Sequence, residues 1–274
     1  MTLHMYPEYY QQRFRVKFWG VRSGIPITRP DTYQFGGNTT CIEINCGNHL
    51  IILEAGTGIR LLGNSIQDSM PTTSHILFTK IDFERICGLP FFSPIYDCSN
   101  KFNVITASPH MRKEPREQVS KLLSHPHFPV PIDVMHGLDS FMSITDFQDQ
   151  ITIKNIKISN FDSELKNQAI GYKICFNEKV ITYIVKLNDF NEQTIEAVNK
   201  FTVNSNLLIL SSSNNILISD ALDFIDSAKK YNAELIIHCG HQPTTNDGIL
   251  DTIQNCFSEN SNDLIAYEGL EINL

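Results

Sequence analysis

The stretch ILFTKIDFERICGLP, residues 76–90, passes from an apolar run into a dense group of charges. Its first three residues are apolar and predict a buried strand. The charged residues that follow are Lys80, Asp82, Glu84 and Arg85. Because α/β proteins place binding and catalytic side chains where buried strands end, this segment is the first candidate for a functional site. A solvent-exposed turn of ordinary ion pairs is the competing interpretation.

The composition indicates a globular protein with an acidic overall charge. The chain has 274 residues, 42% of them hydrophobic, and a formal net charge of -8. This balance argues against a nucleic-acid-binding surface, although a local basic pocket remains compatible with it. No apolar run reaches membrane-spanning length and no signal-peptide segment is recognised, so no membrane partner is expected. Without a composition break, we expect an N-terminal extension, residues 1–14, and one domain, residues 15–274.

The seven cysteines form neither a disulfide framework nor a zinc-binding pattern. Their number is odd, their spacing is irregular, and no Cys-x-x-Cys motif is present. Most of them stand beside apolar residues. We therefore expect reduced, partly buried thiols in a cytoplasmic protein, and no zinc cluster built from cysteines.

Hairpin signals dominate the first half of the chain, and strands alternate with helices in the second half. Gly47-Asn48 stands between two alternating segments and predicts a hairpin. This order favours two sheets packed together with helices outside. The expected strands are residues 15–20, 39–45, 49–53, 76–78, 103–107, two short strands around Asp149 within 139–158, 171–176, 179–185, 207–210 and 235–237. The expected helices are residues 59–66, a segment within 111–123 whose start is limited by Pro115, and residues 192–201, 219–231 and 247–257.

A set of short segments carries a family resemblance. They are VKFWGVR (16–22), GGNTTC (36–41), LEAGTGIR (53–60), the charged turn with GLPFF (88–92), FPV (128–130), GY (171–172) and HCGHQP (238–243). Together they resemble the metallo-β-lactamase fold hydrolases, in the branch of ribonuclease Z-like and phosphodiesterase-like proteins. The resemblance implies an α/β fold, namely a four-layer αββα sandwich with a dinuclear metal site at one edge of the sheets.

The resemblance breaks down at the metal ligands. In the family, a His-x-His-x-Asp-His motif follows this strand and helps to hold two metal ions that activate a hydroxide. The four ligand positions of that motif fall on Lys80, Asp82, Glu84 and Arg85. Further ligand positions fall near Leu165, Lys186 and Gly240. Lysine and arginine side chains have no free lone pair at neutral pH and are not ordinary metal ligands. The resemblance therefore implies the fold and argues against the activity.

Three hypotheses for the altered site follow. In the first, cationic side chains fill the metal volume and pair with neighbouring carboxylates, which gives a catalytically inactive homologue that acts as a binding or interaction module. In the second, the altered metal site is a pocket that binds a phosphorylated or other anionic small molecule. In the third, the protein is a metal-dependent, phosphodiesterase-like hydrolase with an atypical site for zinc or manganese. The ligand-binding candidates of the second hypothesis are Arg22, Asn38, Lys80, Arg85 and His241. The metal-ligand candidates of the third are Asp82, Glu84, His238 and His241.

The remaining expectations concern cofactors, oligomeric state and residues outside the charged turn. No cofactor is expected under the first two hypotheses, and a homodimer is implied by the resemblance only. Cys87 is interpreted as a packing residue, since no partner for a cysteine nucleophile can be assigned. The segment Ser211-Ser212-Ser213 lacks a Gly-x-Ser-x-Gly elbow, and Gly56-Thr57-Gly58 lacks the Gly-Lys-Ser/Thr of a phosphate loop. His125 and His127, on either side of a proline, are interpreted as structural or exposed residues.

Overall fold

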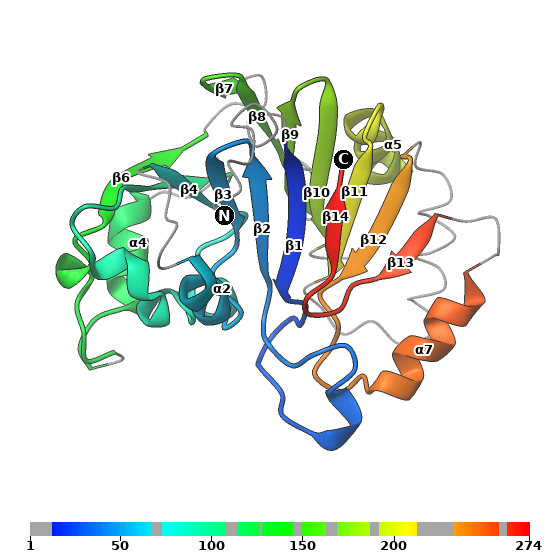
Figure 1. Cartoon of the computed structure of the whole chain (residues 1–274), viewed down its shortest axis with the longest axis horizontal. Coiled ribbons are helices and arrows are strands. Elements are labelled where there is room, and N and C mark those ends of the chain that lie inside the picture. Colours follow the sequence, from blue (N-terminus) through cyan, green and yellow to red (C-terminus); the bar gives the residue numbers. More distant parts are fainter. Residues whose placement is uncertain are drawn as a thin grey trace, which may run out of the picture.

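The chain folds into two β-sheets that pack face to face, with helices on their outer sides (Figure 1). The computed structural model describes residues 13–66, 73–107, 114–126, 128–144, 150–162, 169–186, 192–212, 233–257 and 262–274. Within these ranges each sheet has seven strands. No helix there combines the length and the apolar character that a membrane crossing requires.

The first sheet has the strand order β14-β1-β2-β3-β4-β5-β6. Its strands are β1 (Phe14–Gly20), β2 (Cys41–Cys46), β3 (His49–Leu53), β4 (Ser74–Phe78), β5 (Phe102–Thr106), β6 (Leu138–Ser143) and β14 (Glu271–Asn273). Strands β1 to β3 are antiparallel, and β3 to β6 run parallel to one another. The predicted hairpin at Gly47-Asn48 is confirmed, because β2 and β3 pair directly on either side of it.

The second sheet has the strand order β13-β12-β11-β10-β9-β8-β7. Its strands are β7 (Gln150–Ile153), β8 (Ile156–Asp162), β9 (Ala169–Phe176), β10 (Lys179–Lys186), β11 (Leu207–Ser212), β12 (Leu235–Cys239) and β13 (Asp263–Ile265). Strands β7 to β10 are antiparallel, and β10 to β13 are parallel. In both sheets the chain therefore passes from hairpins to parallel strands that require crossover connections.

The main hydrophobic core lies between the sheets. Strand β1 alternates strictly, with Phe14, Val16 and Phe18 buried and the intervening residues half-buried. The inward side chains of β1 form one apolar cluster with those of the second sheet, including Tyr172 and Tyr183. Fully burying an apolar side chain of this size contributes about 1.5–3 kcal/mol, so this alternation fixes which face of the strand turns inward.

Helices cover the outer face of each sheet. Helices α2 (Ile59–Ile66) and α4 (Pro115–Leu122) pack through Ile59, Leu62 and Val119 on the first sheet. Helix α5 (Glu192–Thr202) packs through Val198 on the second sheet, and α7 (Asp247–Cys256) packs through Leu250 beside β13. The layers are thus helix, sheet, sheet, helix (Figure 1), and the predicted four-layer αββα architecture is confirmed.

Several element predictions differ from the structure. Residues 139–158 were expected to hold two strands around Asp149; instead they contain β6, β7 and the start of β8, with a turn at Lys154-Asn155. Strand β11 extends through Ser212, where a loop was expected, because its parallel pairing with β10 continues to that residue. The three-residue strands β13 and β14 were not predicted. The predicted helix 219–231 lies outside the described residues, and the predicted boundary between residues 14 and 15 stays a prediction, with β1 starting at Phe14.

Candidate functional site

The charged segment after β4 is a single helical turn with its own cap. The carboxylate of Asp82 accepts a hydrogen bond of 3.2 Å from the backbone N–H of Arg85, at the N-terminus of α3 (Phe83–Ile86). An aspartate at this position satisfies a backbone donor that the helix leaves open. The cap turns the side chain of Arg85 inward, where only 4% of it remains exposed. The sequence predicted a charged turn here, and the structure adds that its arginine is buried.

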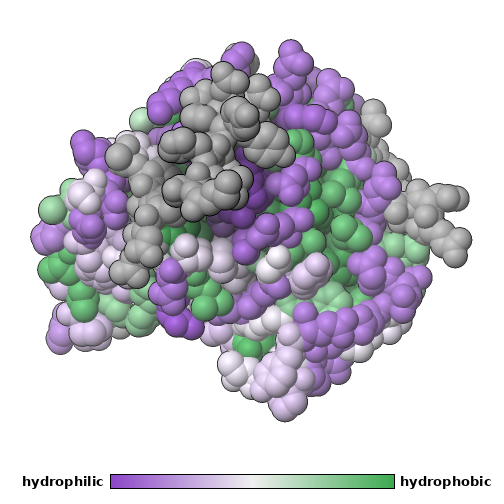
Figure 2. Space-filling model, viewed as in Figure 1, coloured by the Kyte–Doolittle hydropathy of each residue, from purple (hydrophilic) through white to green (hydrophobic). Residues whose placement is uncertain are grey.

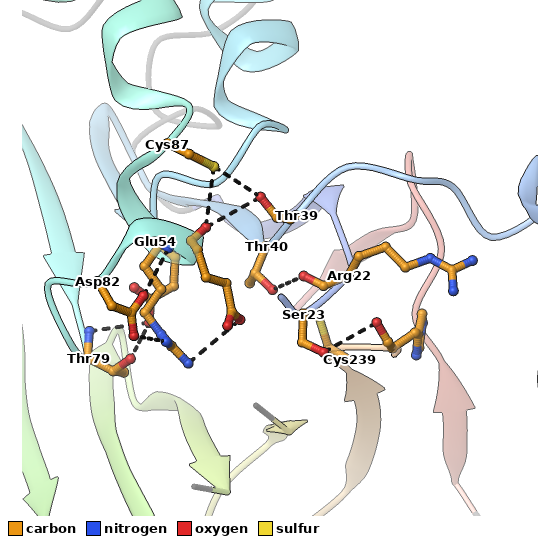
Figure 3. Close-up of polar contacts among 12 residues, drawn as sticks. Arg22, Ser23, Thr39, Thr40, Glu54, Thr79, Asp82, Cys87 and Cys239 are labelled. Carbon is orange, nitrogen blue, oxygen red and sulfur yellow. Dashed lines mark hydrogen bonds and ion pairs between the residues drawn. The ribbon is translucent and has the colours of Figure 1, made fainter. Parts of the chain in front are cut away.

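The guanidinium of Arg85 lies among three carboxylates (Figure 3). Its Nη1 donates to Oδ2 of Asp82 at 2.5 Å. Its Nε lies 3.6 Å from Oε1 of Glu54, and its Nη2 lies 3.8 Å from Oε1 of Glu84. Burial lowers the pKa of Arg85, but the three carboxylates outweigh that effect and raise the pKa above its ordinary value. Arg85 is therefore a permanent cation within a set of acids that would otherwise repel one another.

Glu54 is the member of this group that the sequence analysis did not identify. It follows β3 directly, has a backbone φ of +60°, and is completely buried. Its Oε1 accepts hydrogen bonds from the backbone N–H and the side-chain hydroxyl of Thr79, whereas its Oε2 has no hydrogen-bond partner among the described residues. Burial raises the pKa of Glu54 to about 8, against the opposite influence of Arg85. The one signal in the sequence was an acidic residue at the end of an apolar run.

Lys80 lies at the edge of the same group. Its side chain is half-buried, and no ion pair within 4 Å joins it to a carboxylate in the described part of the chain. Burial and the neighbouring charge of Arg85 lower the pKa of Lys80, while Asp82 and Asp162 act in the opposite direction. Lys80 is thus a cation beside a cation, in a position to accept an anionic neighbour.

Two other predicted ligand positions lie at strand ends of the second sheet. Lys186 is the last residue of β10 and is half-buried, opposite Ser212 of β11. Gly240 follows β12 with a backbone φ of +75°, and a Cβ added there would lie 2.5 Å from the side chain of Ser211 and 2.6 Å from the carbonyl oxygen of Ser212. Gly240 therefore leaves no room for a ligand side chain. Leu165 lies outside the described residues.

Arg22 does not join the Arg85 group. Its guanidinium points away from Glu54 and Asp82 (Figure 3) and donates to three backbone carbonyls. The acceptors are Gly36 at 2.7 Å, Gln242 at 3.2 Å and Thr245 at 2.7 Å. Arg22 is fully buried and holds two loops together, while its Nη2 has no hydrogen-bond partner among the described residues. Its role as a ligand-binding residue stays a prediction.

Asn38 and His241 also have structural partners. The side chain of Asn38 donates to Glu268 at 3.0 Å and accepts from Thr57 at 3.0 Å. The Nε2 of His241 lies 2.7 Å from the carbonyl oxygen of Ala266, and burial lowers the pKa of His241 to about 3. His241 is therefore a neutral donor inside the fold, with no free nitrogen on that side of the ring.

His238 is held apart from the acidic residues after β4. Its Nε2 lies 2.9 Å from Oδ1 of Asp263, and its ring stacks on Phe257 with the centroids 5.1 Å apart. In the described residues no three or more histidine, cysteine, aspartate or glutamate side chains are grouped so that they could hold a metal ion. Asp82 and Glu84 lie beside Arg85 instead, together with Glu54. These residues do not fit the dinuclear centre that the fold implies, and they do not form the atypical four-residue site either.

The cysteine, serine and histidine candidates outside the charged turn show no arrangement typical of a catalytic site in the described residues. The thiol of Cys87 lies 3.7 Å from the hydroxyl of Thr39, and burial raises the pKa of Cys87, so a reactive thiolate is not favoured. Ser211 and Ser212 are buried in β11. His125 is exposed, and His127 lies outside the described residues.

The fold is shared with several solved structures, although the sequences have diverged far. No protein-family model matches the chain, and no curated protein matches it by sequence. The metallo-beta-lactamase fold protein YhfI from Bacillus subtilis is 14% identical, with a TM-score of 0.65 over 96% of this chain and 99% of that one. A diphosphatase of the PhnP family is 11% identical, with a TM-score of 0.64 over 95% and 97%. The short form of human tRNase Z is 11% identical, with a TM-score of 0.55 over 94% and 98%.

These similarities extend over nearly the whole of each chain, so they concern the complete sandwich. At such low identity they establish the architecture alone. Two of the three neighbours are named as hydrolases, the diphosphatase and the tRNase Z. Together with the strand order of both sheets, they show that this chain has the metallo-β-lactamase fold.

Proposed function

We propose that this chain is a non-catalytic homologue of the metallo-β-lactamase-fold hydrolases and acts as a binding module. The observation that carries the proposal is the burial of the Arg85 guanidinium among Glu54, Asp82 and Glu84. A carboxylate that pairs with a guanidinium at 2.5 Å offers no free oxygen on that side to a second cation. A metal ion placed here would also be repelled by Arg85.

The composition of the donor set supports the same conclusion. Hydrolysis in this fold relies on nitrogen and carboxylate ligands that orient a metal-bound hydroxide. In this chain Lys80 and Arg85 stand at two of those positions, and the backbone at Gly240 closes a third. We therefore assign no hydrolytic step to the site.

The ligand that the site suits best is a small anion, such as a phosphorylated molecule, bound through Lys80. Lys80 is half-buried, with Arg85, Asp82 and Asp162 as charged neighbours, and it makes no ion pair within 4 Å to a described carboxylate. Its ammonium group can therefore still donate to an anion. The ammonium group of lysine binds phosphate as a point charge and requires no metal. The other three charged residues of the segment serve mainly to hold one another.

The proposal is tested by isothermal calorimetry with a panel of phosphate esters and nucleotides, on the wild-type chain and on Lys80→Gln. We expect saturable binding that weakens by about tenfold in the variant, as expected for the loss of one charged contact. If no compound of the panel binds, or if both proteins bind equally well, the proposal that Lys80 binds an anion is wrong.

The hydrolase alternative is tested separately, with a chromogenic phosphodiester in the presence of added Zn²⁺ or Mn²⁺. It is favoured only by the diphosphatase and the tRNase Z among the structural neighbours. We expect no turnover above that of the free metal ion. Turnover that is lost in Asp82→Asn would establish the alternative and end the proposal of a non-catalytic protein.

A further inference from the structure

A cavity lined by none of the residues of the Arg85 group lies on the outer face of the first sheet. It has a volume of about 520 Å³ and is bordered by β1, by the β2–β3 hairpin and by the last residues of α2. The side chains of Arg13, Arg15 and Lys17 line it, together with Trp19 and Glu43. Because Phe14, Val16 and Phe18 turn into the core, the strict alternation of β1 places the charged residues and the tryptophan on this outer face.

Glu43 organises the floor of the cavity. Its side chain is only 3% exposed and accepts hydrogen bonds from three neighbours. The donors are Arg15 at 2.6 Å, the indole Nε1 of Trp19 at 2.7 Å and Asn45 at 2.5 Å. Both carboxylate oxygens are thus used, and the guanidinium and the indole are held in fixed positions. A site whose side chains are held in place before a ligand arrives loses less entropy on binding.

The walls of the cavity carry more positive than negative charge. Arg13, Arg15 and Lys17 face a single lining carboxylate, Glu43. Glu271 of the neighbouring strand β14 pairs with Lys17 at 2.7 Å and approaches Arg15 at 3.4 Å, which leaves one net positive charge in the group. This excess is unusual in a chain of net charge -8, where repulsion would otherwise keep anions away.

Two donors in the cavity have no partner in the described residues. The Nε of Arg15 is buried and makes no hydrogen bond there. Arg13 forms no ion pair within 4 Å, while its backbone carbonyl accepts from Gly47 at 2.7 Å and so fixes the residue beside the β2–β3 turn. The Nε of Arg15 is too buried for a ligand in the cavity to reach, so the guanidinium of Arg13 is the donor group of this pair that an anion could contact.

Apolar surface completes the lining. Trp19, Leu50 and Ile66 border the cavity, and the Nζ of Lys17 lies 4.4 Å from the centre of the Trp19 ring. Figure 2 shows hydrophilic residues in the middle of the face, with hydrophobic residues to their right. The lining thus suits a molecule with a charged end and an apolar part.

We propose that this cavity is a binding site for a nucleotide-sized organic molecule with two or more negative charges. The charged end would contact the side chains of Arg13 and Lys17, and the apolar part would lie against Trp19 and Ile66. The volume of about 520 Å³ is within the range of small-molecule sites. Neither Lys80 nor Arg85 lines this cavity, so the proposed binding site can be tested separately from the function proposed above.

The test is calorimetric titration of the full chain with three probes: tripolyphosphate, ATP and citrate. Tripolyphosphate supplies charge alone, ATP adds an apolar ring, and citrate separates carboxylate from phosphate recognition. The variants are Arg13→Gln with Lys17→Gln, and Arg13→Gln alone, since Arg13 makes no ion pair with another described residue. Arg116→Gln, at an exposed position within α4, is the control for a lost arginine charge.

We expect at least one probe to bind, with ATP tighter than tripolyphosphate, and the double variant to weaken binding by about tenfold or more while Arg116→Gln and Lys80→Gln leave it unchanged. Binding should also weaken at higher ionic strength. The proposal is overturned if none of the three probes binds, or if the double variant binds as well as the wild type. Loss of binding in Lys80→Gln would instead assign the ligand to the Arg85 group.

Discussion

The Nε of Arg85 lies 3.6 Å from Oε1 of Glu54, a carboxyl group that is completely buried and belongs to a residue with a backbone φ of +60°. These residues are 31 positions apart in the sequence, and their contact brings the end of β3 to the turn after β4. Since the parallel strands β3 and β4 are neighbours, both residues emerge at the same sheet edge. The pair therefore forms part of the structure at the place where the sequence resemblance implies metal ligands.

Replacing Arg85 by methionine should destabilise the protein strongly. Arg85→Met keeps much of the side-chain volume but leaves the carboxylates of Asp82 and Glu84, and the buried carboxyl group of Glu54, without their shared cation, which should cost about 3–5 kcal/mol. Urea unfolding measures this loss. Arg85→Lys keeps the charge but not the planar fork, so its loss should be smaller. Equal stability of the methionine variant and the wild type would show that the guanidinium does not neutralise the group.

Glu54 should make the protein less stable as pH rises through neutrality. Burial raises the pKa of Glu54 to about 8 from 4.5, so the folded state binds a proton that the unfolded state has already released. Its stabilising contribution is complete below pH 4.5 and is lost as pH rises to 8. In Glu54→Gln this slope should disappear, because the amide does not titrate. Unfolding at pH 6.5 and pH 8 measures it; a slope that is equal in both proteins would contradict the assignment.

The buried pair His49 and His75 should give the opposite trend at acid pH. The Nε2 of His49 lies 2.8 Å from the Nδ1 of His75, and burial lowers the pKa of His75 to about 4. Below pH 6.5, His75 binds a proton in the unfolded state but stays neutral in the folded state. The free energy of unfolding should therefore fall as pH decreases from 6.5 to 4. His75→Gln should reduce this fall, whereas His136→Gln, at an exposed position, should not. Thermal unfolding of the three proteins across this range is the measurement.

Two glycine substitutions should have opposite effects. A Cβ on Gly20 would lie 1.9 Å from the carbonyl oxygen of Thr39, so Gly20→Ala must displace backbone and should cost about 3 kcal/mol or more. In α7, the nearest atom to a Cβ on Gly248 is 3.6 Å away, so Gly248→Ala should stabilise the helix by about 0.5–1 kcal/mol. Thermal shift assays measure whether each substitution lowers or raises the melting temperature. A tolerated alanine at position 20 would mean that the close approach between Gly20 and Thr39 is not required.

Arg22 should matter for stability rather than for ligand binding. Arg22→Lys retains a charge but offers no fork to the carbonyls of Gly36, Gln242 and Thr245, and should cost about 2 kcal/mol or more. Unfolding of the variant measures this cost. Any ligand affinity of the Lys80 site should be unchanged at a temperature where the variant is folded. A weaker ligand affinity of Arg22→Lys with unchanged stability would instead indicate that Arg22 binds the ligand.

Local patterns predicted most of the fold. The hairpin of β2 and β3, the helix at residues 59–66 and the hairpin of β9 and β10 follow from alternation, turn residues and helical spacing, which depend on neighbours in the sequence. Strands β13 and β14 were missed because three residues carry too little pattern, and they are defined by pairing with β12 and β1.

The contacts of the site were less predictable. The sequence placed Lys80, Asp82, Glu84 and Arg85 together, but not Glu54, because nothing local marks a contact between residues 31 positions apart. The contacts of Arg22 were unpredictable for a similar reason: two of its acceptors are backbone carbonyls more than 200 residues later in the chain, and every residue has such a carbonyl whatever its side chain.

The metal content of the full chain is the most direct test of the non-catalytic assignment. The protein is purified without chelator, incubated with Zn²⁺ or Mn²⁺, freed of excess ion and analysed by elemental mass spectrometry, beside Asp82→Asn and Glu84→Gln. We expect far less than one ion per chain, and no difference among the three proteins, because the acids at this site surround Arg85. One or more ions per chain in the wild type, lost in either variant, would contradict the account.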